Sequence, residues 1–164
     1  MIFVAVGTQF PFDRLIRYVD EWASRHGVVG MAQIAGGEYL PQYLQWERFM
    51  TTPVFNQHLQ AADLIISHAG MGNIITALEN RKPIIVMNRQ HALGEHRNDH
   101  QLDGLEWMSK LPGVYTATTQ AELTALLERR QTLQAAPLAS DSRRQVLVDF
   151  IDQAICASTP SSKP

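Results

Sequence analysis

The sequence predicts an α/β protein whose mainly parallel, Rossmann-like sheet carries helices on both faces. Short apolar runs, typical of buried strands, alternate along the chain with longer segments whose apolar residues recur at helical spacing. The length of 164 residues suits a single domain with a sizeable core. We therefore expect one domain over residues 1–157 and a flexible tail over residues 158–164.

The chain opens with a predicted strand, helix and strand. Ile2–Val6 is a continuous apolar run, and Val28–Ile34 is a second strand-like run. Between them, Phe12–Ser24 has apolar residues at helical spacing. Asp13 is well placed in the first turn of this helix, and Gly27 lies just past its end. This order is the repeating unit of a parallel sheet.

Further units follow in the same order. The middle of the chain is predicted as a partly exposed strand, a short helix, a strand, a helix and a strand, over Tyr43–Thr51, Pro53–Gln60, Leu64–Ser67, Asn73–Asn80 and Pro83–Met87. The rest is predicted as a polar loop, a helix, a short strand and two helices, over Asn88–Arg97, Asn98–Lys110, Val114–Thr116, Ala121–Arg130 and Asp141–Ala157. Thr119 is the expected N-cap of the helix Ala121–Arg130, with Glu122 at the capping-box position.

Bulk composition excludes several function classes. A formal net charge of −2 gives no case for non-specific binding to nucleic acid. The single cysteine, Cys156, excludes an internal disulfide and is compatible with a reducing compartment. No apolar run approaches the roughly 18 residues of a membrane span, and the N-terminus has the pattern of a strand rather than of a signal peptide. We expect a cytoplasmic protein that reaches a membrane only through a partner.

The most informative motif is the glycine-containing turn after the third predicted buried strand. Gly70 and Gly72 follow the apolar run and break it, and a helical pattern comes next. Backbone N–H groups at a helix N-terminus are unsatisfied, and the helix dipole places about half a positive charge there, so the turn suits a phosphate or pyrophosphate. His68 and Asn73 flank the turn and could donate to the same anion. The alternative is an ordinary tight turn that needs glycine for its backbone conformation.

Three loops are expected to converge on one edge of the sheet. They are Gly7–Phe10, His68–Asn73 and Asn88–Gln101, and each follows a predicted strand. Ligands of open α/β sheets bind outside the carboxyl ends of the strands. The first loop, with Gly7, Thr8 and Gln9, leads from a strand into a helix and so offers a second cluster of backbone donors.

Four segments resemble the C-terminal, nucleotide-sugar-binding half of GT-B glycosyltransferases of family 28. They are Val6–Leu15, Ile66–Ile74, Lys82–Val86 and Gly94–Gln101, and the resemblance covers about residues 1–130. The chain is most similar to small bacterial proteins of capsule and exopolysaccharide operons that form one subunit of a split glycosyltransferase. These are related to the soluble subunit of the eukaryotic transferase that adds the second GlcNAc to dolichol pyrophosphate.

The resemblance implies which residues bind a UDP-sugar. The turn around His68 would hold the diphosphate, the segment with His100 and Gln101 would lie near the sugar, and backbone near Phe55 would receive the uracil. The alternative for His100 and Gln101 is that they cap a solvent-facing helix. The expected nucleotide-sugar-binding residues are Gly7, Thr8, Gln9, Phe55, His68, Gly70, Met71, Gly72, Asn73, Thr76, His100 and Gln101.

One position departs from the family pattern. Many relatives carry a ribose-binding glutamate where this chain has Thr76, and Glu79 lies about one helical turn further on. The ribose contact is therefore in question. A non-catalytic binding module that stimulates a partner transferase is the resulting alternative to a catalytic subunit.

The resemblance also implies partners. A complete GT-B enzyme has two such domains with the active site between them, so the acceptor-binding half would be a second, membrane-anchored polypeptide. The acceptor would be a polyprenyl-pyrophosphate-linked saccharide, and the UDP-sugar would be the donor substrate, with no cofactor. This places the protein at the inner face of the membrane.

The general base cannot be assigned from the sequence. Glu95 and His96 are candidates, but we favour a base on the partner chain. Glu95, His96 and His100 do not have metalloprotease spacing and lack an evident third protein ligand, so we expect no metal. A dinucleotide-dependent oxidoreductase is a poor alternative, because the first loop is not Gly-x-Gly-x-x-Gly and no acidic residue ends the second strand.

Overall fold

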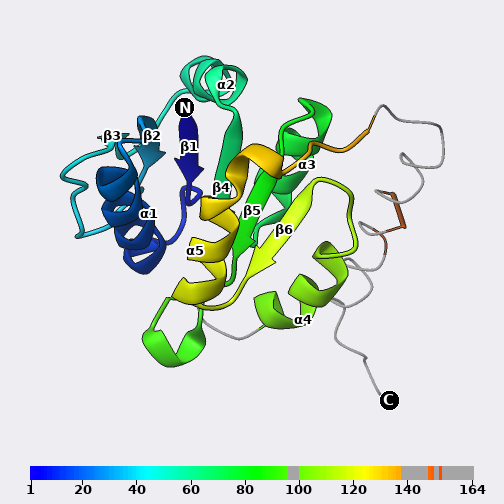
Figure 1. Cartoon of the computed structure of the whole chain (residues 1–164). Helices are drawn as coiled ribbons and strands as arrows, with labels where there is room; N and C mark the ends of the chain where they lie inside the picture. The colour runs from blue at the N-terminus through cyan, green and yellow to red at the C-terminus, as the bar shows by residue number, and fades with distance from the viewer. Residues whose placement is uncertain (96–99, 138–147, 150–151, 153–164) are drawn as a thin grey trace.

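The structure is a computed structural model, and it describes residues 1–95, 100–137, 148, 149 and 152. Its sheet has six strands in the order β3-β2-β1-β4-β5-β6, and each neighbouring pair is parallel (Figure 1). The strands are β1 Ile2–Ala5, β2 Gly30–Gln33, β3 Gln45–Glu47, β4 Leu64–His68, β5 Ile84–Met87 and β6 Val114–Ala117. The predicted parallel α/β sheet is confirmed.

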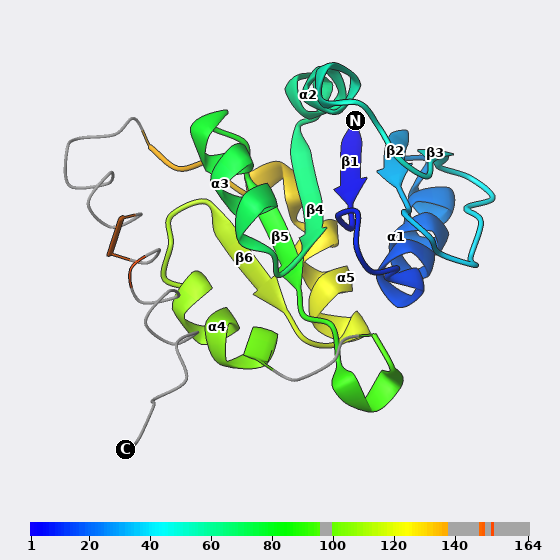
Figure 2. The ribbon, with the colours of Figure 1, turned by 180° about the vertical axis from the view of Figure 1, so that it is seen from behind.

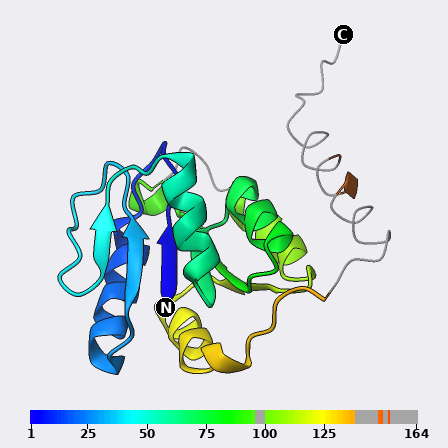
Figure 3. The same cartoon turned by 90° about the horizontal axis from the view of Figure 1, so that it is seen from above.

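Helices cover both faces of this sheet (Figures 2 and 3). They are α1 Asp13–His26, α2 Thr52–Ala61, α3 Met71–Glu79, α4 His100–Met108 and α5 Gln120–Glu128, with short 3-10 turns η1 His91–Leu93 and η2 Arg130–Thr132. Helices α1 and α5 pack on one face, and α2, α3 and α4 pack on the other. The sheet therefore separates two apolar cores.

The alternation of side chains explains why the strands are apolar throughout. In β1, Ile2 and Val4 belong to the core under α1 and α5, whereas Phe3 and Ala5 belong to the core under α2, α3 and α4. Successive strand residues point to opposite faces, and here both faces are covered. A continuous apolar run is the expected signature of such a strand.

Local signals in the sequence place two helix ends correctly. Gly27 has φ 64° at the end of α1, and its N–H donates to the carbonyl of Ala23. At the start of α5, the Thr119 side chain accepts from the Glu122 N–H, and the Glu122 carboxylate accepts from the Thr119 N–H. The predicted capping box is confirmed.

The edge strand β3 is shorter than expected, because only Gln45–Glu47 pair with β2, and all three residues are exposed.

The loop before β3 is held by Asp20, a buried carboxylate on α1. Asp20 accepts from the Tyr39 hydroxyl at 2.8 Å and from the N–H groups of Gln42, Tyr43 and Leu44 at 2.8, 3.1 and 2.8 Å. Burial alone would raise the pKa of Asp20, but these hydrogen bonds outweigh it and lower the pKa.

Some expectations lie outside the described residues. The predicted helix Asp141–Ala157 falls there apart from residues 148, 149 and 152, and so does the tail 158–164. Within the described part of the chain, no helix is long and apolar enough to cross a membrane.

Candidate functional site

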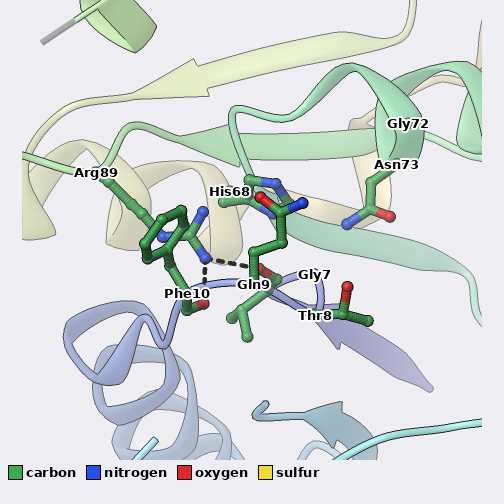
Figure 4. A pocket seen from close by; sticks show the side chains of 9 residues that line it. Gly7, Thr8, Gln9, Phe10, His68, Gly72, Asn73 and Arg89 are labelled. Atoms are coloured by element: carbon green, nitrogen blue, oxygen red, sulfur yellow. Dashed lines mark hydrogen bonds between the residues drawn. The ribbon is translucent and has the colours of Figure 1, made fainter. Parts of the chain in front are cut away.

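The first two predicted loops and the described start of the third meet where the strand order of the sheet reverses. From β1 the chain crosses by α1 to β2 on one side, and from β4 it crosses by α3 to β5 on the other. Loops diverge at such a switch point, which leaves a crevice at the carboxyl ends of the strands. A cavity of about 310 Å³ lies there, lined by Val6, Gly7, Thr8, Gln9, Phe10, His68, Gly72, Asn73 and Arg89 (Figure 4).

His68 occupies a space that two glycines leave for it. A Cβ on Gly7 would lie 3.0 Å from the imidazole Cε1, and a Cβ on Gly70 would overlap the ring. Gly7 also has φ 82°, which disfavours any other residue. The imidazole therefore lies between the β1–α1 loop and the start of α3, and it lines the cavity.

The N-terminus of α3 opens onto the same cavity. Gly70 is its N-cap residue, and no side chain caps the helix. The first N–H groups of a helix have no intrahelical acceptor, and the dipole favours an anion there. A Cβ on Gly72 would meet nothing within 4 Å, so the approach to these donors is open. A phosphate-sized anion suits this end of the helix.

Asn73 differs from its expected role, because its amide faces inward. Nδ2 donates to the Ala5 carbonyl at 3.1 Å and to the Ser67 hydroxyl at 2.8 Å, and that hydroxyl donates to the same carbonyl at 2.8 Å. Both amide donors are thereby engaged between β1, β4 and α3. Asn73 positions the helix start instead of donating from its side-chain amide to an anion.

Arg89 is the charged residue of the cavity that was not among the expected binding residues; Val6 and Phe10 also line the cavity without having been expected. It follows β5 by two positions and is only 3% exposed. Burial lowers the pKa of Arg89 to about 10, with a smaller opposing effect of the Glu95 carboxylate, so the guanidinium stays charged at neutral pH. Its place directly after an apolar strand, at the ligand edge of the sheet, was the available signal.

Glu95, a candidate general base, is held by Arg14. The carboxylate accepts from Arg14 Nε at 2.8 Å and from Nη2 at 2.9 Å, and it also accepts from the Gln90 N–H at 2.9 Å. The two side chains are 15% and 12% exposed. The hydrogen bonding of Arg14 to the Glu95 carboxylate is the largest influence on the pKa of Arg14, which it raises. This pair fastens the loop after β5 to the first turn of α1.

Three other predicted residues, Phe55, Met71 and Thr76, do not line the cavity. Phe55 packs edge-on against Phe3 with ring centroids 5.0 Å apart, and Met71 packs against the same core. The Thr76 hydroxyl donates to the Gly72 carbonyl at 2.8 Å. None of these three lines the cavity.

The segment expected near the sugar is described only in part. His100 and Gln101 begin helix α4, but their side chains lie outside the described residues, as does all of His96. Among the described residues, no group of three His, Cys, Asp or Glu side chains is placed to hold a metal ion.

Comparison with known proteins fits this geometry. The family model of the glycosyltransferase family 28 C-terminal domain matches residues 1–145. The chain belongs to this family. The predicted resemblance is confirmed. It was expected over about residues 1–130 of this chain, and the match extends to residue 145.

Two mammalian proteins are similar in sequence to this family 28 domain. The human UDP-N-acetylglucosamine transferase subunit ALG13 is 33% identical over 129 residues, and its mouse counterpart is 29% identical over 161 residues. These matches cover 71% and 84% of this chain. The chain spans only 11% and 13% of the two proteins.

Solved structures show the same fold. The solution structure of ALG13 has a TM-score of 0.64 at 22% identity, covering 92% of this chain and 96% of that one. The calicheamicin glycosyltransferase CalG4 has a TM-score of 0.58 at 15% identity, and the match covers 98% of this chain but 40% of CalG4. The expected equivalence to one half of a GT-B glycosyltransferase is confirmed at the level of the fold.

Proposed function

We propose that this chain is the UDP-sugar-binding subunit of a heteromeric glycosyltransferase. The cavity at the switch point of the sheet carries this proposal, because it combines an open helix N-terminus, a glycine loop, His68 and a buried guanidinium. These groups all favour a phosphate-bearing anion. UDP-N-acetylglucosamine is the first donor to test, since the named relatives are subunits of a transferase for that sugar.

The chemical role of the cavity is to stabilise the leaving diphosphate. When the bond between the sugar and the diphosphate breaks, negative charge develops on the diphosphate oxygens. Fixed N–H donors and a fixed cation lower the energy of that charge without reorganising. In this proposal the role falls to His68, which lines the cavity, and to the N–H groups at the uncapped start of α3.

A second polypeptide supplies the acceptor and the base in this proposal. The cavity lies at an open edge of a single sheet, whereas the same fold forms about 40% of CalG4. Electrostatic stabilisation is far stronger when water is excluded, and the acceptor hydroxyl must be held near the donor carbon. We assign both tasks to a membrane-anchored partner that binds a polyprenyl-pyrophosphate-linked acceptor in surface polysaccharide synthesis.

Reconstitution tests the proposal. Transfer from a UDP-sugar to a polyprenyl-linked acceptor is measured with the purified chain, with partner membranes, and with both together. Turnover only in the combined sample supports the split enzyme. Full turnover by the purified chain alone, or by the partner membranes alone, contradicts it.

Thr76 favours a second candidate, a non-catalytic module that stimulates a partner transferase. It stands where many relatives place a ribose-binding glutamate, and its hydroxyl donates to the Gly72 carbonyl. The two functions separate when the pair is assayed with His68→Ala in this chain. Loss of turnover at saturating partner supports the catalytic subunit, whereas unchanged turnover supports the module.

A further inference from the structure

We infer that Arg89 is a positioning residue for the anion cavity. Its guanidinium donates to carbonyl groups of the β1–α1 loop, and this leaves the N–H groups of the loop to bind the anion. The inference rests on the proposed function for the identity of the anion as a diphosphate. It concerns a residue that touches the loop rather than the reacting atoms.

The contacts of Arg89 reach both ends of the loop. Nη2 donates to the Val6 carbonyl at 2.7 Å and to the Phe10 carbonyl at 2.6 Å (Figure 4). Nε donates to the Pro11 carbonyl at 3.4 Å. The guanidinium carbon also lies 5.2 Å from the centroid of the Phe12 ring, which leads into α1. One side chain from the loop after β5 therefore sets the path of the chain between β1 and α1.

These contacts matter because a loop can present either N–H groups or carbonyl groups to a ligand. Carbonyl oxygens carry partial negative charge, and in the cavity they would repel a phosphate. Each carbonyl that accepts from Arg89 is turned to the guanidinium and partly neutralised by it. The loop residues between the Val6 and Phe10 carbonyls, Gly7 to Gln9, line the cavity, and none of their carbonyls is among those that accept from Arg89.

The charge of Arg89 adds to this effect. The side chain is 3% exposed and lines the cavity, so its positive charge acts through protein rather than through bulk water. Lysine is a poor substitute, since a compact ammonium lacks the planar fork that reaches several carbonyls and is costlier to bury. The structure thus explains why an arginine occupies this position.

Arg89→Met tests the inference, with Arg48→Met, a change at a more exposed arginine, as a control for the loss of contacts to loop carbonyls. Arg48 also donates to two loop carbonyls, Ala35 at 3.2 Å and Gly37 at 2.9 Å, and it lines no part of this cavity. Calorimetry compares UDP, uridine and inorganic pyrophosphate. We expect Arg89→Met to weaken UDP and pyrophosphate about 10- to 100-fold while uridine binding stays nearly unchanged, and Arg48→Met to leave all three unchanged.

Two further variants keep the test decisive if Arg89→Met does not fold. Arg89→Lys keeps the charge, and we expect UDP binding to weaken about 5-fold or more, because the fork is lost. Arg89→Gly leaves a space for free guanidinium ion, and millimolar guanidinium should restore part of the UDP affinity. A merely structural residue would lower uridine binding as much as UDP and pyrophosphate binding, and guanidinium would then restore all three alike.

The outcomes separate the inference from the proposed function. Unchanged UDP and pyrophosphate binding in Arg89→Met, or an equal loss of uridine binding, would overturn the inference. If the natural chain binds pyrophosphate but not UDP, and Arg89→Met loses pyrophosphate, the inference stands and the proposed function fails. If the natural chain binds neither anion, both fail.

Discussion

Replacing Gly72 by alanine should stabilise the protein and weaken its binding of UDP. Gly72 is the second residue of α3, and a Cβ there would meet nothing within 4 Å. The fold therefore has room for the methyl group. Glycine within a helix costs roughly 0.5–1 kcal/mol relative to alanine, so the free energy of unfolding should rise by up to about 1 kcal/mol.

The same methyl group should obstruct the anion. Every Cα–Cβ bond of a helix tilts toward the helix N-terminus, so the Cβ of residue 72 would point to the end where the donors are open. Losing one hydrogen bond to a charged phosphate costs about 1.5–3 kcal/mol, which corresponds to a fall in UDP affinity of roughly 10- to 150-fold.

Calorimetry with UDP and urea denaturation measure the two effects separately. Gly36→Ala is the matched control, because Gly36 is exposed, a Cβ there also meets nothing within 4 Å, and the residue lies outside the cavity. UDP affinity should be unchanged in that control. If Gly72→Ala is stably folded and binds UDP as the natural chain does, the anion does not sit at the start of α3.

Three other substitutions test separate parts of the account. His68→Ala removes a donor at the cavity and should lower UDP affinity roughly 10- to 150-fold by calorimetry, with UMP less affected; equal effects on both would argue against a diphosphate contact. Glu95→Gln leaves Arg14 without its charge partner in a largely buried place. Urea denaturation should therefore show that the free energy of unfolding falls by about 3–5 kcal/mol, and adding Arg14→Met should recover part of this loss. A fall of under about 0.5 kcal/mol would mean that the pair does not hold the loop. Because the folded pKa of Asp20 is below its ordinary value of 3.8, its stabilising effect is present above that value and is lost as the pH falls through the folded pKa. Asp20→Asn should therefore lower stability near neutrality and flatten its loss in acid, and an unchanged acid limb of the denaturation profile would refute this assignment.

Sequence reasoning succeeded where local chemistry decides the structure. Gly27 and Thr119 mark helix ends through contacts within five residues, and apolar runs mark strands that are covered on both faces. The convergence of the loops followed from the parallel order of strands. The sequence predicts an edge strand β3 that is longer than the observed one. Its three residues are exposed, so no alternation of buried and exposed residues marks where the strand begins and ends.

The missed features depend on partners that are distant in the sequence. Arg89 has the pattern of a solvated loop residue, and only the fold brings the carbonyls of Val6 and Phe10, some 80 positions away, around its guanidinium. Glu95 lies 81 positions from Arg14, so its pairing could not be read from spacing. The inward amide of Asn73 likewise depends on the Ala5 carbonyl of another strand.

An amide NMR titration of the chain with UDP, in the presence of a metal chelator, tests the central claim most directly. The account predicts that the largest shifts fall on the backbone N–H groups of Gly7 to Gln9 and of Gly70 to Asn73, which border the cavity. The amides of Gly27 and Gly113, in turns elsewhere, should not move. No shift with UDP in the chelator, or shifts centred outside these two loops, would contradict the claim that this cavity binds a nucleoside diphosphate without a metal ion.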